Sequence, residues 1–141
     1  MNNKDINSKP TKVYLKIKSF DVGMHNRIIS ALKKLSLPKE WLINEEILVD
    51  DEDLYSIIWV KDQSNEQYFS DIDERDDRLK RATKLLDKFD KNIISEIKEL
   101  DPIIFLGITT KQEFLPLNLD LMNMCARTGV EIYLYFFKAE E

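Results

Sequence analysis

The sequence predicts an α+β fold: a single layer of about four to five mostly antiparallel strands with helices packed on one face, in the order β-α-β-α-β-α-β. Short segments rich in β-branched and aromatic residues alternate with segments whose apolar residues recur every three or four positions. Residues 12–20 and 130–137 alternate apolar and polar side chains, which favours a sheet with one less buried face. No expected strand leads into a glycine-rich loop, so a nucleotide-binding parallel fold has no support.

The sequence of the first half of the chain predicts two strands, one helix and a segment that is either a strand or a loop. Residues 12–20 alternate as a half-buried strand, and Asp21 can cap a helix that ends near Leu35. Pro38 then breaks the helical pattern. Residues 41–53 predict a short strand or an extended loop, and residues 54–60 predict a strand.

The strongest helical pattern covers residues 71–100, with a bend or break expected near Asp90. Its apolar positions are Leu79, Ala82, Leu86, Phe89, Ile93, Ile97 and Leu100. Beyond it, residues 103–110 predict a strand and residues 115–129 a helix with Asn118 as N-cap and Gly129 after its end. The closing strand is expected at residues 130–137.

The length of 141 residues fits one domain, with a flexible tail at 1–11 and a single α+β domain at 12–141. The polar start has no apolar signal-peptide segment, and no apolar run approaches the roughly 18 residues that span a bilayer. We therefore expect a cytoplasmic protein that does not contact membranes. The single cysteine, Cys125, excludes an internal disulfide.

The net charge of −5 is unevenly distributed along the chain. Residues 1–44 hold nine Lys/Arg against three Asp/Glu, whereas residues 45–77 hold two against thirteen. Residues 78–141 are balanced. Such asymmetry bears on partners and on electrostatic steering rather than on the fold.

The acidic middle segment is the main candidate for a binding surface. The candidate partner-binding residues are Asp50, Asp51, Glu52, Asp53, Tyr68, Phe69, Asp71, Asp73, Glu74, Asp76 and Asp77. Acids at the start of a helix also cap it and favour its dipole, so a capped helix beside a solvated loop is the competing interpretation. Tyr68 and Phe69 are expected aromatic anchors, whereas Trp59 is expected to pack in the core.

The sequence carries no catalytic or metal-binding signature. A calcium loop starting at Asp71 would need glycine at the place of Asp76 and glutamate at the place of Ala82. His25 and Cys125 lie far apart in sequence, in different expected helices, and Cys125 is expected to be a small buried apolar residue. We therefore expect a non-enzymatic protein without a metal or other cofactor.

The expected outer sheet face offers an alternative. Tyr14, Lys16 and Lys18 share one strand face, and Tyr133 and Tyr135 share a face of the last strand. If these strands were neighbours, aromatics beside lysines could stack the bases of a single-stranded nucleic acid or bind a small ligand. The acidity of the chain makes nucleic acid the less expected ligand.

The last third of the chain resembles a known family. A long amphipathic helix leads into "PIIFLGITTK", followed by "LNLDLMNMCARTGVEIYLYFF", and the opening "KVYLKIKSFDVGMHNRIISALKKL" is compatible with the same pattern. These segments resemble the bacterial family called domain of unknown function 4279. The resemblance implies a small α+β domain without an assigned reaction, and an immunity protein that binds and neutralises a cognate toxin domain, such as a nuclease with a basic cleft.

Overall fold

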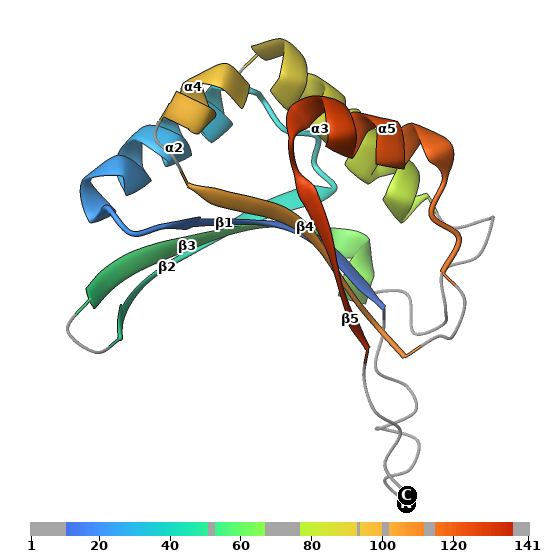
Figure 1. Ribbon diagram of the computed structural model, residues 1–141, viewed down its shortest axis with the longest axis horizontal. Coiled ribbons are helices and arrows are strands. Elements are labelled where there is room, and N and C mark those ends of the chain that lie inside the picture. The colour runs from blue at the N-terminus through green and yellow to red at the C-terminus, as the bar shows by residue number, and fades with distance from the viewer. Residues whose placement is uncertain are drawn as a thin grey trace, which may run out of the picture.

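The computed structural model describes residues 11–50, 53–66, 77–92, 94–99, 102–111 and 115–136. Within these residues one sheet of five strands has the order β2-β3-β1-β4-β5, and the helices lie on one of its faces (Figure 1). The strands are β1 (Lys12–Ser19), β2 (Trp41–Asp50), β3 (Asp53–Asp62), β4 (Ile103–Thr110) and β5 (Glu131–Phe136). The helices are α2 (Val22–Lys34), the 3-10 helix η1 (Gln63–Glu66), α3 (Arg78–Asn92), α4 (Ile94–Glu99) and α5 (Leu119–Thr128).

The predicted α+β class is confirmed, and the order of elements departs from strict alternation by one strand, β2, in the segment where the sequence left a strand or an extended loop open. β2 runs directly into β3 as an antiparallel hairpin, with no helix between them. β1 lies antiparallel between β3 and β4, which gives the first four strands the order of a split βαβ sheet. α5 then connects β4 to a parallel neighbour, β5, so the sheet is mixed.

Local signals explain the two helices with defined caps. The Asp21 side chain accepts a hydrogen bond of 2.9 Å from the amide of Gly23, and α2 buries Ile28 and Leu32 as its pattern predicts. The Asn118 side chain likewise accepts from the amide of Leu121 at 2.7 Å. Gly129 ends α5 in the left-handed conformation, with φ 72°, as its position predicts.

The long helix predicted over residues 71–100 is shorter and interrupted. Asp77 lies outside the helix, and its carbonyl accepts the amide of Arg81 at 2.8 Å, which makes it the residue that opens α3. The expected capping residues before Asp77 lie outside the described residues. α3 ends at Asn92 and α4 begins at Ile94, close to the break expected near Asp90.

The core lies between the helices and one face of the sheet. β1 contributes Val13, Leu15 and Ile17, and α3 contributes Leu86 and Phe89, all at most 1% exposed. Other members from the strands and from α5 are Ile58, Val60, Leu106, Ile108, Leu121 and Cys125. No helix among the described residues is long and apolar enough to span a membrane.

A buried ion pair joins β3 to α3 at the far end of the hairpin. Arg81 donates from Nε to Asp62 Oδ2 at 2.8 Å and from a terminal nitrogen to Asp62 Oδ1 at 3.2 Å. Ser64 donates both its amide and its hydroxyl to Asp62. The Asp62 carboxylate is fully buried, so these hydrogen bonds from Arg81 and Ser64 replace the bonds to water that it loses on folding.

Candidate functional site

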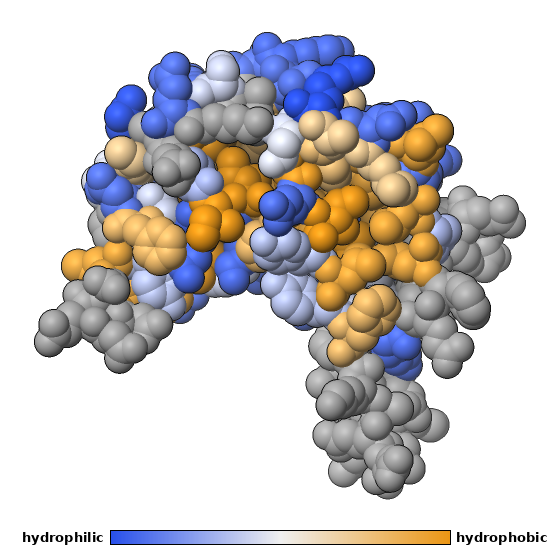
Figure 2. Space-filling model, viewed as in Figure 1, coloured by the Kyte–Doolittle hydropathy of each residue, from blue (hydrophilic) through white to orange (hydrophobic). Residues whose placement is uncertain are grey.

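The sheet face opposite the helices is the principal candidate site. The sheet is arched, with the helices on its convex side, and the other face lines the hollow beneath (Figures 1 and 2). Side chains alternate between the faces of a strand, so the residues between the core positions lie on this hollow side. We call it the aromatic–lysine face, made up of Tyr14, Lys16, Lys18, Tyr55, Trp59, Lys61, Phe105, Tyr133 and Tyr135.

The strand register brings these residues into rows across the sheet. Tyr14 pairs with Lys61 on one side and with Gly107 on the other, and Gly107 pairs with Tyr133. The alternative considered from sequence required β1 and β5 to be neighbours, whereas β4 lies between them. The two tyrosines nevertheless share a row, two strands and therefore about 10 Å apart.

Gly107 permits this arrangement. A Cβ atom built at residue 107 would lie only 2.3 Å from two ring carbons of Tyr14, so the Tyr14 ring rests directly over the β4 backbone. A glycine within a strand often marks such a close approach. Burial, and to a lesser extent the charge of Tyr135, raises the pKa of Tyr14, so its hydroxyl stays neutral at physiological pH.

Beside this row, Phe105 and Tyr133 form a stack. Their ring centres lie 4.3 Å apart with an interplanar angle of 23°. Phe105 is only 6% exposed, whereas Tyr133 is 38% and Tyr135 46% exposed. A hydrogen bond to the Glu131 carboxylate is the main cause that raises the pKa of Tyr133. The accessible rings at this end are therefore the two tyrosines, and the buried Phe105 ring stacks against Tyr133.

Lysine side chains lie over the rings in the middle of the face. Lys16 Nζ is 5.9 Å from the centre of the Trp59 ring and 5.6 Å from that of Phe105. Lys61 Nζ is 5.4 Å from Trp59. These distances fit cation–π contacts, in which the lysine stems also shield apolar ring surface. Trp59 thus lies half-buried on the aromatic–lysine face, and its predicted place in the core is wrong.

A second cluster extends the face toward the β2–β3 turn. Lys18 Nζ lies 4.4 Å from the Tyr55 ring and 5.1 Å from the Phe20 ring, and the two rings are 6.4 Å apart. Phe20 is 62% exposed. The face therefore presents accessible aromatic surface and positive charge along much of its length, in a chain whose net charge is −5.

The described acidic candidates fall at two separate places. Asp50 and Asp53 pair at the end of the β2–β3 hairpin, and Asp77 is exposed before α3. Arg81 ties the start of α3 to Asp62, so Asp53 and Asp77 lie at opposite ends of β3, about 30 Å apart along the strand. The remaining candidates, Asp51, Glu52, Tyr68, Phe69, Asp71, Asp73, Glu74 and Asp76, lie outside the described residues.

The two residues considered for covalent chemistry do not meet. His25 Nε2 lies 3.0 Å from Glu45 Oε1, and α2 and α5 occupy opposite ends of the helix layer (Figure 1). Cys125 is buried, which raises the pKa of its thiol to about 11 and keeps the thiolate form scarce. No group of three or more His, Cys, Asp or Glu within the described residues could hold a metal ion.

Comparisons with protein-family models, with curated proteins and with solved structures found no match for this chain. The resemblance to the domain of unknown function 4279 therefore stays a prediction.

Sequence reasoning identified Tyr14, Lys16, Lys18, Tyr133 and Tyr135 as one possible surface and missed the rest of it. The missed members are Tyr55, Trp59, Lys61 and Phe105, and sequence reasoning also missed Phe20, which extends the face, and Gly107, which permits it. The signal that could have found Gly107 is its position inside an apolar strand pattern, where glycine often marks a close contact.

Proposed function

We propose that this chain is a non-enzymatic protein that binds single-stranded nucleic acid on the aromatic–lysine face. The observation that carries the proposal is the combination, on the sheet face opposite the described α-helices, of accessible aromatic rings with lysine ammonium groups beside them. Stacking on aromatic side chains and contact of phosphates with cations are the two interactions that bind single strands without sequence readout.

Each component has an assigned role. Trp59, Tyr14 and Tyr133 offer ring surface for bases, at about 1–3 kcal/mol per stacked base. Lys16 and Lys61 now lie over the Trp59 ring, and a bound phosphate would draw their ammonium groups off the ring and open it for stacking. With about three lysines engaged, the logarithm of the affinity should fall with the logarithm of salt at a slope of about −2.

Trp59 fluorescence tests the proposal. The chain has two tryptophans, so a Trp41→Phe variant leaves Trp59 as the single reporter. Titration with a mixed-sequence single strand at low salt should quench this fluorescence saturably, and the duplex of the same sequence should bind more weakly. Tyr14→Ala and Lys16→Ala should weaken binding. The matched controls Phe136→Ala and Lys33→Ala change exposed residues off the face and should leave it unchanged.

Two results would overturn the proposal: no saturable quenching at low salt, or equal losses in the face variants and the controls.

A second candidate function is inhibition of a cognate toxin domain, as an immunity protein. The observation that favours it is the hairpin end, where Asp50 and Asp53 pair next to Ile47, Val49 and Leu54, which are 52%, 72% and 51% exposed. Exposed apolar side chains in an acidic segment of the chain suit a basic protein cleft, because charge steers the encounter and apolar contact supplies affinity.

The product of the neighbouring upstream reading frame, purified as a candidate toxin, tests this function. It should bind the chain stoichiometrically and lose its toxicity on co-expression. The variant Asp50→Lys/Asp53→Lys should bind weakly, whereas Asp120→Lys, which changes an exposed acid on α5, should bind normally. Unchanged binding by the hairpin variant would exclude the hairpin end as the contact surface.

A further inference from the structure

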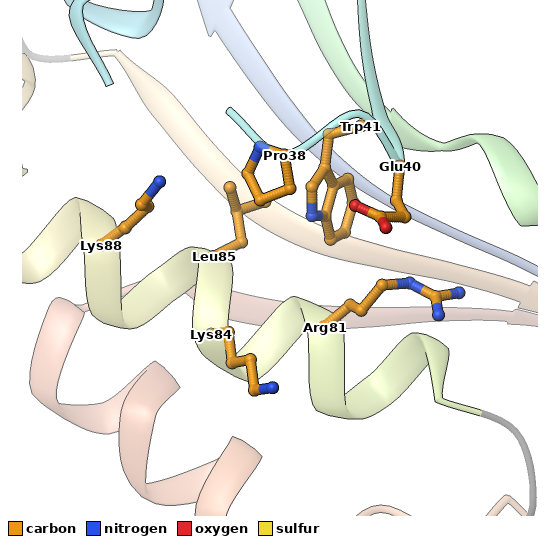
Figure 3. Close-up of a pocket in the computed structure, with 7 residues that line it drawn as sticks. All are labelled: Pro38, Glu40, Trp41, Arg81, Lys84, Leu85 and Lys88. Atoms are coloured by element: carbon orange, nitrogen blue, oxygen red, sulfur yellow. The ribbon is translucent and has the colours of Figure 1, made fainter. Parts of the chain in front are cut away.

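A cavity on the helix side of the sheet has the features of a second, separate binding site. It lies between α3, the loop after α2 and the start of β2, with a volume of about 380 Å³ (Figure 3). This volume falls in the range of small-molecule sites. The aromatic–lysine face is on the opposite side of the sheet, so the two sites share no lining residue.

The floor of the cavity is apolar and fixed by the core. Trp41 and Leu85 line it, and both belong to the core cluster, at 6% and 2% exposed. Pro38 forms an adjoining wall, and its carbonyl accepts the amide of Trp41 at 3.0 Å, which holds the loop against the strand. A flat apolar group could therefore lie against Trp41, Pro38 and Leu85 without rearrangement of the backbone.

The rim on α3 is positively charged. Arg81, Lys84 and Lys88 line the cavity and are spaced three and four residues apart on α3. In Figure 3 the Lys84 side chain points away from Trp41 and Pro38, so its ammonium group reaches the cavity only when the side chain turns. Glu40 is the acidic residue among those that line the cavity. The lining therefore has an excess of positive charge in a chain that is negative overall.

The three cations differ in what already holds them. Arg81 is bound to Asp62, and Lys88 donates to the carbonyls of Leu35 and Ser36, at 3.3 Å each, at the end of α2. Among the described residues, Lys84 is exposed and has no hydrogen bond or ion pair. Arg81 and Lys88 are thus held by partners within the chain, whereas the Lys84 side chain can turn toward an incoming anion.

We infer that this cavity binds a small organic anion with a flat apolar body. The apolar body lies against Trp41, Leu85 and Pro38, and the carboxylate or phosphate group reaches Lys84 at the rim, with Lys88 beside it. Charge-assisted hydrogen bonds to the head group supply selectivity for anions, and the apolar floor supplies selectivity for ligands larger than inorganic phosphate.

Naphthoate is a suitable probe, with uncharged naphthamide as the matched control. A Trp59→Phe variant leaves Trp41 as the single tryptophan, in the cavity floor. Naphthoate should change Trp41 fluorescence saturably and shift the backbone amide resonance of Leu85. Naphthamide should bind about tenfold more weakly, because it lacks the charge-assisted hydrogen bond.

Charge reversal locates the head group. Lys84→Glu should weaken naphthoate binding about tenfold or more. Lys80→Glu changes an exposed lysine of the same helix that does not line the cavity, and it should weaken binding clearly less than Lys84→Glu, because it removes no direct contact with the head group. Both residues are exposed, so both variants should keep the circular dichroism spectrum of the parent.

Three results would overturn the inference: no saturable change at Trp41, equal affinities for naphthoate and naphthamide, or equal losses in the Lys84 and Lys80 variants. The readout at Trp41 is separate from the readout at Trp59, so failure here leaves the proposed nucleic-acid function untouched, and the reverse holds as well.

Discussion

Replacing Gly107 with alanine would place a methyl group where the Tyr14 ring now lies. The new Cβ would be 2.3 Å from ring atoms Cε2 and Cζ and 2.7 Å from Oη. Carbon atoms in contact are about 3.5–4.0 Å apart, so the ring must move by more than about 1 Å. The nearest atoms belong to the far end of a half-buried side chain, so Tyr14 should swing toward solvent while the β4 backbone stays in place.

The expected change in stability is small. Overpacking typically lowers stability by about 1–3 kcal/mol, and the loss should be at the lower end of that range because the Tyr14 ring can move out toward solvent. Gly107 has no positive φ, so alanine is allowed there and recovers roughly 0.5–1 kcal/mol of backbone entropy. The free energy of unfolding, measured by urea denaturation, should therefore change by less than about 1 kcal/mol.

The expected change in binding is larger. Losing one stacked base costs about 1–3 kcal/mol, or roughly 5- to 150-fold in affinity for a single strand. Exposure of the ring should also lower the pKa of Tyr14 toward its ordinary value, which ultraviolet titration measures.

A Tyr14→Ala background supplies the control for Gly107→Ala. With the Tyr14 ring absent, the alanine at residue 107 should leave the affinity unchanged, because the two effects act through one side chain. A loss of affinity that persists in this background would refute the role assigned to Tyr14. A loss of stability above about 3 kcal/mol would refute the expected movement of the ring toward solvent.

Three further predictions concern the scaffold. Asp62→Ala should lower the free energy of unfolding, measured by urea denaturation, by about 3 kcal/mol. This value is at the low end of the cost of breaking a buried ion pair, because Arg81 is partly exposed. A loss below about 1 kcal/mol would contradict the prediction. Ser36→Gly should stabilise by roughly 0.5–1 kcal/mol in the same assay, because Ser36 has φ 51°; destabilisation would contradict it. Because burial raises the pKa of Cys125 from 9.0 to about 11, the unfolded chain loses this proton first, and stability should fall between these pH values by up to about 1.4 kcal/mol per pH unit. Below pH 9.0 the thiol should contribute no pH dependence, and Cys125→Ala should remove the part of the slope that comes from the thiol, leaving the part that comes from the raised pKa values of Tyr14 and Tyr133.

The sequence predicted best the features that depend on neighbouring residues. The caps Asp21 and Asn118 and the left-handed Gly129 satisfy backbone groups within a few positions of themselves, so they can be recognised without knowledge of the fold. The buried stripes of α2 and α3 follow from helical periodicity in the same way.

Features that depend on distant strands were not predictable. β2 is an edge strand with Glu45 and Glu46 at its centre, so its weak alternation left open whether it was a strand or a loop. β3 is apolar on both faces, with Ile57 as well as Ile58 buried, so no alternation indicated that Trp59 faces away from the helices. The place of β4 between β1 and β5 follows from pairing across the whole chain.

The central position of β1 has a consequence for how the chain folds. Among the described strands, β1 is made first and pairs on both sides with strands that come later, and Lys12 can meet Thr109 only after all the residues between them have been synthesised. Closing so long a loop slows folding, whereas the β2–β3 hairpin can form from local contacts alone. During synthesis, β1 therefore has both edges unpaired until β3 is made and one edge unpaired until β4 is made, and a ribosome-bound chain truncated before β3 should be the form most prone to aggregation.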